Sequence, residues 1–178
     1  MIVVRPGAPN AALTGAWSTV VREPFNGKDC SVPVPLDVRM PVASYQVVVR
    51  AMDHVLNDVE SAALGADRTL MLPSLSCSPQ DLIDASARLA SAQGLALGAV
   101  KEDVSPLAER IVRGMGSRTD GSRASALGVS GDVSADSIVA AYMEDYVLDG
   151  VRMTQPIPNP LGEAGLMGTP QAWPSEKE

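Results

Sequence analysis

Hydrophobic positions recur along this chain in two patterns, one typical of buried strands and one typical of amphipathic helices. Ile2, Val3 and Val4 form a continuous apolar run, as in a strand that is covered on both faces. The segment "YQVVVRAMDHVLND" from Tyr45 repeats apolar residues at helical spacing, and Ser44 before it can cap the helix. Both patterns together predict a mixed α/β fold.

The same patterns, with capping and turn residues, predict the other elements. Helices are expected over residues 11–22, after the caps Ser78, Ser105 and Ser134, and as a short turn over residues 121–128. Extended segments are expected over residues 30–34, 67–73 and 95–100. Pro33 and Pro35 restrict the first of these to the edge of a sheet or to a loop, because proline cannot donate to a ladder.

The chain divides near Arg152. Residues 153–178 are crowded with proline and glycine and show no period, which predicts a flexible tail. Residues 1–152 are expected to form one α/β domain. With 178 residues in all, 46% of them apolar, the chain is long enough for one sizeable core.

Net charge and hydropathy limit the kinds of partner and the cellular location that are expected for this chain. The net charge is -7, and no cluster of Lys and Arg is interleaved with aromatic residues, so nucleic acid is not expected as a partner. No stretch approaches twenty apolar residues, and the start of the chain lacks a secretory pattern. These observations predict a cytoplasmic protein that does not enter a membrane.

Standard catalytic and nucleotide-binding signatures are absent, including the glycine-rich dinucleotide turn, the P-loop and the serine elbow. Cys30 and Cys77 lie far apart and predict reduced structural thiols. His54, the single histidine, lies in a helical pattern and predicts a surface or boundary residue. Two pairs of carboxylates are expected to be solvated charges on helix surfaces: Asp53 with Asp58, and Glu144 with Asp145.

Three stretches nevertheless resemble a known family. They are "IVVRPGAPNAALTGAWSTVVREPFNGKD", "RTLMLPSLSCSPQDLIDA" and "SRASALGVSGDVSADSIVAAYMED". Together they are similar to the carboxy-terminal half of extended short-chain dehydrogenases, nearest to the D-erythronate dehydrogenase-like branch of the NAD-dependent epimerase/dehydratase proteins. The resemblance implies a partial Rossmann-type substrate domain that lacks the nucleotide-binding half.

The resemblance also implies a substrate pocket. In the family, a strand that ends in R-P-G leads into a P-N turn and a helix that line this pocket, which would place Arg5, Pro9 and Asn10 there. The segment "LPSLSCSPQDL" is similar to a pocket-lining loop and implies hydrogen bonds from Ser74 and Ser76. An ion pair or a surface position remains open for Arg5, and loop capping remains open for the two serines.

Two classes of function stay open. The first is the substrate-binding half of an NAD-dependent sugar or sugar-acid epimerase or dehydrogenase, which would bind a sugar acid or a sugar phosphate. In the family the glycine-rich turn and the Y-x-x-x-K catalytic pair lie upstream of R-P-G, and this sequence contains neither. The chain alone is therefore expected to bind no NAD and to lack the family's acid/base group.

The second class is a freestanding small-molecule-binding protein, or an enzyme of another class, that reuses the pocket. Assembly is a further expectation, drawn from the first strand. An apolar strand with an uncovered edge favours pairing with another chain. The sequence therefore predicts a homo-oligomer, or a partner subunit that carries the nucleotide-binding half.

Overall fold

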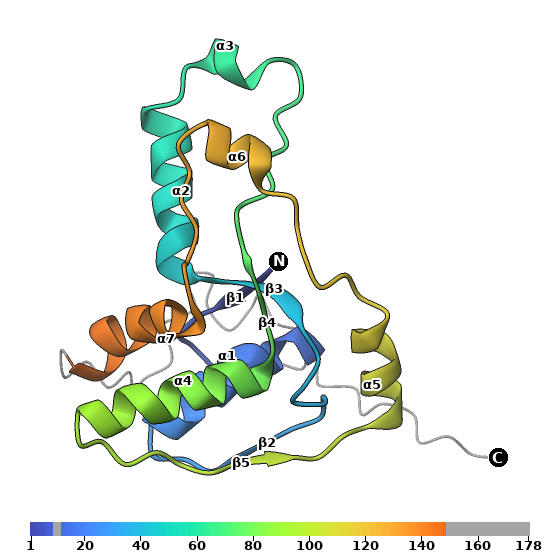
Figure 1. Cartoon of the computed structure of the whole chain (residues 1–178), viewed down its shortest axis with the longest axis vertical. Coiled ribbons are helices and arrows are strands. Elements are labelled where there is room, and N and C mark those ends of the chain that lie inside the picture. Colours follow the sequence, from blue (N-terminus) through green and yellow to red (C-terminus); the bar gives the residue numbers. More distant parts are fainter. Residues whose placement is uncertain (9–11, 149–178) are drawn as a thin grey trace, which may run out of the picture.

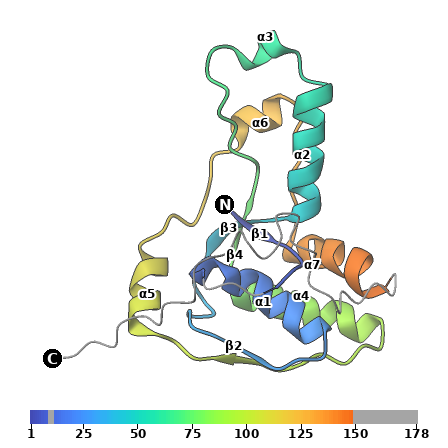
Figure 2. The same ribbon diagram turned by 180° about the vertical axis from the view of Figure 1, so that it is seen from behind.

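The computed structural model describes residues 1–8 and 12–148, which form a broad base and a lobe that rises from it (Figure 1). We define the upper lobe as residues 45–72 and 121–129 and the base as the other described residues. Figure 2 shows the same division from behind. None of the helices in the described ranges is long and apolar enough to cross a lipid bilayer.

The base contains a three-stranded sheet in the order β1-β3-β4. Its strands are β1 (Ile2–Val4), β3 (Met40–Ser44) and β4 (Leu75–Cys77). Strand β1 runs parallel to β3, with Val3 opposite Ala43, and β4 runs antiparallel to β3. A separate parallel pair joins β2 (Cys30–Val32) to β5 (Val100–Glu102). The strand predicted at residues 2–4 is confirmed, and it lies at an edge of its sheet.

Three helices pack against one another, and the first and the last of them also pack against the larger sheet (Figure 1). They are α1 (Ala16–Phe25), α4 (Pro79–Ala92) and α7 (Ala135–Met143). Their shared core contains Trp17, Leu82 and Ile138, each with no exposed surface. The Trp17 indole Nε1 donates to the Cys77 carbonyl at 3.0 Å, so the polar atom of this buried ring is satisfied.

Short helices connect or extend these elements. They are η1 (Leu13–Gly15) before α1, α5 (Pro106–Arg113) after β5, and the π-helical η2 (Glu144–Leu148) after α7. The upper lobe contains α2 (Tyr45–Asn57), α3 (Ser61–Leu64) and α6 (Ser122–Ala126). The predicted caps are confirmed, since each serine hydroxyl accepts from a backbone N–H in the first turn of its helix: Ser44, Ser78, Ser105 and Ser134.

Two predicted strands are wrong, and one strand was not predicted. Residues 67–73 form no strand, and the antiparallel strand begins only at Leu75. The segment 95–100 contributes only Val100 to β5. Strand β3 is the central strand of the sheet, although it contains Pro41. The mixed α/β fold is confirmed, whereas the proposed tail over 153–178 lies outside the described residues.

Candidate functional site

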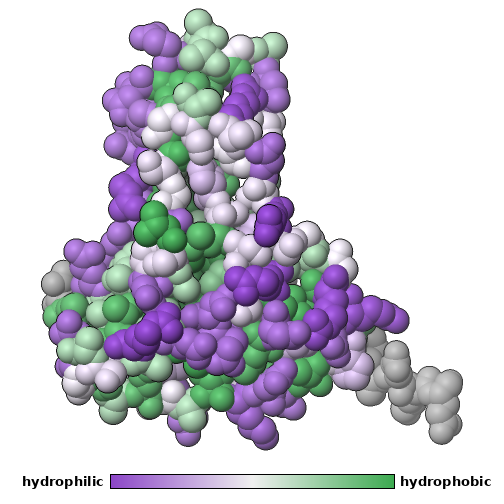
Figure 3. Space-filling view, in the orientation of Figure 1, coloured by the Kyte–Doolittle hydropathy of each residue, from purple (hydrophilic) through white to green (hydrophobic). Residues whose placement is uncertain are grey.

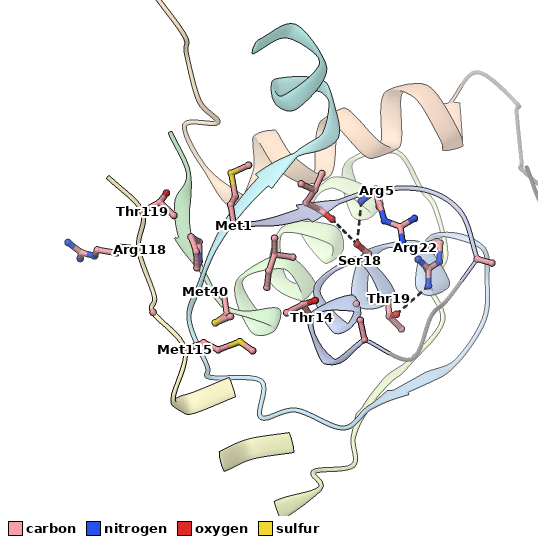
Figure 4. A pocket seen from close by; sticks show the side chains of 17 residues that line it. Met1, Arg5, Thr14, Ser18, Thr19, Arg22, Met40, Met115, Arg118 and Thr119 are labelled. Atoms are coloured by element: carbon pink, nitrogen blue, oxygen red, sulfur yellow. Dashed lines mark hydrogen bonds between the residues drawn. The ribbon is translucent and has the colours of Figure 1, made fainter. Parts of the chain in front are cut away.

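A cavity of about 600 Å³ opens beside the edge strand β1 (Figure 4). Its walls come from β1 and the turn after it, from η1 and one face of α1, from the start of β3, and from the segment 115–119 that follows α5. Segments far apart in the sequence therefore meet around one space. The dimensions suit a small molecule.

The R-P-G turn shapes one end of this cavity. Gly7 has φ +101°, a conformation that residues with a Cβ rarely adopt, so the chain can turn sharply after β1. The Arg5 backbone N–H donates to the Ser18 hydroxyl at 3.3 Å, and that hydroxyl donates to the Val3 carbonyl at 3.1 Å. Ser18 thus joins α1 to the edge of β1. The exposed Arg5 side chain lies along the cavity, and its Nη1 donates to the Pro6 carbonyl at 3.2 Å.

A second arginine reaches the same end from α1. Arg22 is only 6% exposed, yet its side chain lines the cavity. Its Nε lies 2.7 Å from a carboxylate oxygen of Glu23, and its Nη2 donates to the Thr19 hydroxyl at 3.3 Å. Because Thr19 and Arg22 are three residues apart in the helix, they share one face. In Figure 4 this pair lies next to Arg5.

The opposite wall is different in character. It presents the thioether side chains of Met1, Met40 and Met115 (Figure 4). Arg118 is exposed at the rim, and its guanidinium points away from the cavity. The cavity therefore has a cationic, hydroxyl-rich end and a methionine end.

The charge of the lining is opposite to that of the whole chain. Arg5 and Arg22 line the cavity, Arg118 lies at its rim, and no Asp or Glu is among its described lining residues. The protein as a whole has a net charge of -7. A positively lined cavity in an acidic protein concentrates anions locally, so its chemistry suits an anionic ligand.

The predicted site residues are not gathered around this one cavity. Arg5 lines it, and Pro9 and Asn10 lie outside the described residues. Ser74 contacts the cavity only indirectly, since its hydroxyl lies 2.6 Å from that of Thr119, which does line it. Ser76 lines a second, smaller cavity of about 280 Å³ together with Arg39, Asp81, Asp84 and Arg88. A binding role for the two serines stays a prediction.

Sequence reasoning did not single out Arg22 or Thr19. Helical periodicity contained a signal for Arg22, because it falls among the buried positions Trp17, Val21 and Pro24 of the same helix. A charged residue on an apolar helix face is uncommon unless it is paired or functional. Thr19 gave no comparable signal.

Other reactive groups in the described residues have structural surroundings. No group of three or more His, Cys, Asp or Glu could hold a metal ion there. Cys30 and Cys77 are free thiols, as expected. Burial, followed by the charge of Asp81, raises the pKa of the Cys77 thiol to about 12, so this thiol stays protonated and unreactive at neutral pH.

One expectation about carboxylates is wrong. Asp145 is not simply solvated, because the Tyr45 hydroxyl and the Gln46 amide both donate to its Oδ2. These two hydrogen bonds lower the pKa of Asp145. Asp53 and Asp58 are exposed, as predicted. Asp53 accepts from the Asn57 amide, and Asp58 lies beside His54.

Comparison with known proteins finds relatives that match this chain over part of their length. The chain is 34% identical over 146 residues to D-erythronate dehydrogenase from Cupriavidus necator, covering 81% of this chain and 44% of that protein. It is 30% identical over 144 residues to the Haemophilus influenzae D-erythronate dehydrogenase, again covering 44% of the relative. The chain is a partial relative of the D-erythronate dehydrogenase and sugar epimerase family.

Solved structures share the fold of this chain. The nucleoside-diphosphate-sugar epimerase from Agrobacterium tumefaciens is 29% identical, with a TM-score of 0.69, and the match covers 80% of this chain and 41% of the epimerase. The L-threonine 3-dehydrogenase from Trypanosoma brucei, at 15% identity and a TM-score of 0.63, shares the fold over 80% of this chain and 42% of its own. No family model matches the sequence. This partial relative spans less than half the length of the proteins it matches.

Proposed function

We propose that this partial relative forms the substrate-binding part of an NAD-dependent oxidoreductase or epimerase that acts on a sugar acid or a sugar phosphate. The observation that carries the proposal is the cavity beside β1, where the side chains of Arg5 and Arg22 lie together at one end and no carboxylate is among the described lining residues. Two relatives are D-erythronate dehydrogenases, and erythronate is a small sugar acid. Its carboxylate matches the charge of the cavity.

The chain's own residues would bind and orient the substrate. Guanidinium groups bind carboxylates and phosphates through several hydrogen bonds in a fixed geometry, so Arg5 and Arg22 can fix one end of an anionic substrate. The hydroxyls of Thr14 and Thr19 line the same cavity and suit the hydroxyls of a sugar. In this proposal, the NAD site and the tyrosine–lysine pair belong to the other part of the enzyme, and the whole is cytoplasmic.

Calorimetric titration of the purified protein tests the proposal. We expect D-erythronate to bind and erythritol, which has the same carbon skeleton without the carboxylate, to bind far more weakly. Titration with NAD and NADP serves as a second arm and is expected to show no binding. If erythronate, related aldonates and sugar phosphates all fail to bind, the proposed substrate class is wrong. Micromolar binding of NAD would contradict the division of the enzyme into two parts.

One observation favours the alternative of a freestanding binding protein. Strand β1 pairs with β3 inside the chain's own sheet, and the core around Trp17 closes without another chain. The first proposal includes a homo-oligomer or a partner subunit at the outer edge of β1, whereas the alternative requires a monomer. Light scattering over a range of concentrations distinguishes them. A concentration-independent monomer that binds sugar acids would support the freestanding protein.

A further inference from the structure

Arg22 is buried in a way that a structural ion pair alone does not explain. The Arg22 side chain is 7% exposed and that of Glu23 is 14% exposed, so both charges are largely removed from water. Such a pair is strongest when a carboxylate accepts from two guanidinium nitrogens at once. Here Glu23 contacts Nε, and the Nη2 of Arg22 donates to the neutral Thr19 hydroxyl instead. The outer part of the guanidinium therefore faces a hydroxyl and the cavity.

Thr19 remains able to bind a further group. Its oxygen accepts the hydrogen bond from Arg22, so its own hydroxyl proton is available for donation. Thr19 and Arg22 both line the cavity. An oxyanion placed against this face of α1 could accept from the guanidinium and from the hydroxyl.

Arg5 adds a second positive charge at the same end. It lies beside Arg22 in Figure 4 and forms no ion pair with any described residue. Two guanidinium groups are thus balanced by the single carboxylate of Glu23. The remaining positive charge would be neutralised by one bound anion.

The far end of the cavity offers no matching charge inside it. Met40 and Met115 present thioethers, which are weak hydrogen-bond acceptors and not donors. The Arg118 guanidinium points away from the cavity. The Thr119 hydroxyl at this end already bonds to the Ser74 hydroxyl and donates to the Leu72 carbonyl. A second anionic group on the ligand would therefore find no cation inside this end of the cavity.

We infer that Arg22, with Thr19 and Arg5, forms a subsite for one terminal oxyanion, and that the opposite end of the ligand is uncharged. This inference rests on the proposed function and narrows it. Aldonates and singly phosphorylated sugars fit the site, whereas aldarates, which carry a carboxylate at each end, are excluded. Arg22 is the residue that determines the preference for an acid over the corresponding neutral polyol.

The test compares four proteins by calorimetry: the parent, Arg22→Gln, Thr19→Val and Arg118→Gln. Arg118→Gln is the matched control, because it removes the same charge from the rim. Loss of a charge-assisted hydrogen-bonding group is expected to weaken binding of D-erythronate about 10- to 100-fold in Arg22→Gln, and loss of a neutral hydroxyl about 3- to 10-fold in Thr19→Val. Arg118→Gln is expected to change affinity less than about 3-fold.

Titrations with three further ligands show which anionic group the site prefers and how many such groups it accepts. Erythritol is expected to bind the parent weakly and to bind Arg22→Gln with the same affinity. Erythritol has no carboxylate, so it does not use the charge that the substitution removes. Tartrate, a four-carbon dicarboxylate, is expected to bind the parent more weakly than erythronate. Erythritol 4-phosphate distinguishes a preference for phosphate from one for carboxylate. Tight tartrate binding that Arg118→Gln abolishes would overturn the inference in favour of a two-ended site.

Arg22→Gln removes a buried charge, so its folding is checked by thermal melting, and Arg22→Lys provides a second variant. Lysine keeps the positive charge but lacks the planar guanidinium group with its several donors. Arg22→Lys is therefore expected to recover part of the preference for erythronate over erythritol. Inorganic phosphate is the second probe, because it needs only the cationic end. Phosphate is expected to raise the melting temperature of the parent and of Arg118→Gln but not that of Arg22→Gln. This result would support the subsite even if no sugar acid binds and the proposed function is wrong. Equal binding by the parent and Arg22→Gln would overturn the subsite alone.

Discussion

The base and the upper lobe are held together by different kinds of interaction. In the base, large side chains such as Trp17 and Leu82 are fully buried in one continuous cluster that includes residues of the sheet and of helices α1, α4, α5 and α7. The core of the upper lobe contains only Ala51, Ala124 and Val129, with Val55 and Leu72 packed against it. Small residues bury little apolar area, so this second core contributes much less hydrophobic stabilisation.

Polar contacts in the upper lobe compensate for part of the hydrophobic stabilisation that its small core lacks. The Arg123 guanidinium donates to the backbone carbonyls of Leu64, Asp67 and Thr69 and also pairs with the Asp67 carboxylate. One side chain thus fixes a loop that has no regular structure. His54 links α2 to the loop after α6, because its Nε2 lies 2.8 Å from the Leu127 carbonyl.

The outer surface of the lobe is also less covered. On α2, Val49 and Met52 are each 60% exposed and Leu56 is 81% exposed, which forms an apolar stripe on the helix (Figure 3 shows the hydropathy of one face). The lobe is therefore expected to open at lower free energy than the base. The cavity and its arginines belong to the base, so local opening of the lobe leaves the Arg5–Arg22 end of the site intact.

The largest expected effect comes from one substitution made in both regions. Leu82→Ala in the base leaves a cavity in the main core and should lower the free energy of unfolding by about 2–5 kcal/mol. Leu56→Ala on the exposed face of α2 should change it by less than about 0.5 kcal/mol. Urea denaturation measures both. Similar losses for the two variants would show that the α2 stripe is covered in solution.

Removing the polar centre of the lobe should have the next largest effect. Arg123→Ala leaves three backbone carbonyls without their donor and is expected to cost about 1–3 kcal/mol, confined to the lobe. Hydrogen exchange should show lost protection in α2 and α6 with the amides of α1 and α4 unchanged. Arg68→Ala is the matched control, since exposed Arg68 contacts only the Ser61 hydroxyl. A uniform loss of protection in both regions would contradict the separation of the two cores.

Substitution of two glycines, one in each region, measures the cost of a close contact between Gly128 and His54 in the upper lobe. Gly128 has φ +89°, and a Cβ there would lie 3.0 Å from the His54 Nε2, whereas Gly27 has φ +71° and nothing within 4 Å of a Cβ. Alanine at either position should cost about 1–2 kcal/mol from backbone strain alone. Gly128→Ala should exceed Gly27→Ala, because the histidine must also move. Chemical denaturation of the two variants gives the difference, and an equal cost would mean that His54 moves away freely.

The smallest effect concerns pH. Hydrogen bonding to the Leu127 carbonyl and then to Asp58 raises the pKa of His54. A group whose pKa is raised on folding stabilises the protein fully below its unfolded pKa, about 6.5, and this contribution is lost as the pH rises through the folded value. Protection of the lobe should therefore fall slightly from pH 6 to pH 8. Because His54→Gln does not titrate, the persistence of that decline in the variant would assign it to another group.

The sequence predicted the elements whose boundaries are local. Each capping serine lies next to the helix that it starts, so its signal needs no knowledge of the rest of the chain. Strand β3 depends on its neighbours instead, because β1 and β4 on either side supply its hydrogen bonds. Proline inside a strand argues against a central position, and Pro41 therefore concealed the middle of the sheet.

The candidate site divides in the same way. Arg5 could be predicted, because the R-P-G turn is a continuous motif that carries its own signal. Arg22 and Thr19 could not be assigned to the site, since only the folded contact between α1 and β1 brings them beside Arg5. Met40 and Met115 belong to still more distant segments, and neither has a pattern that distinguishes a cavity wall from ordinary core.

The hydroxyl of Ser18 has a consequence for the order of folding. Its bonds to Val3 and Arg5 span only 15 and 13 residues, whereas β1 must find β3 across about forty. Because short loops close at lower entropic cost, we expect the unit made of β1 and α1 to form before the sheet is completed. The cationic end of the cavity lies wholly within that unit. It would thus be assembled early from one short piece of chain, and the methionine wall would be added as the long-range contacts form.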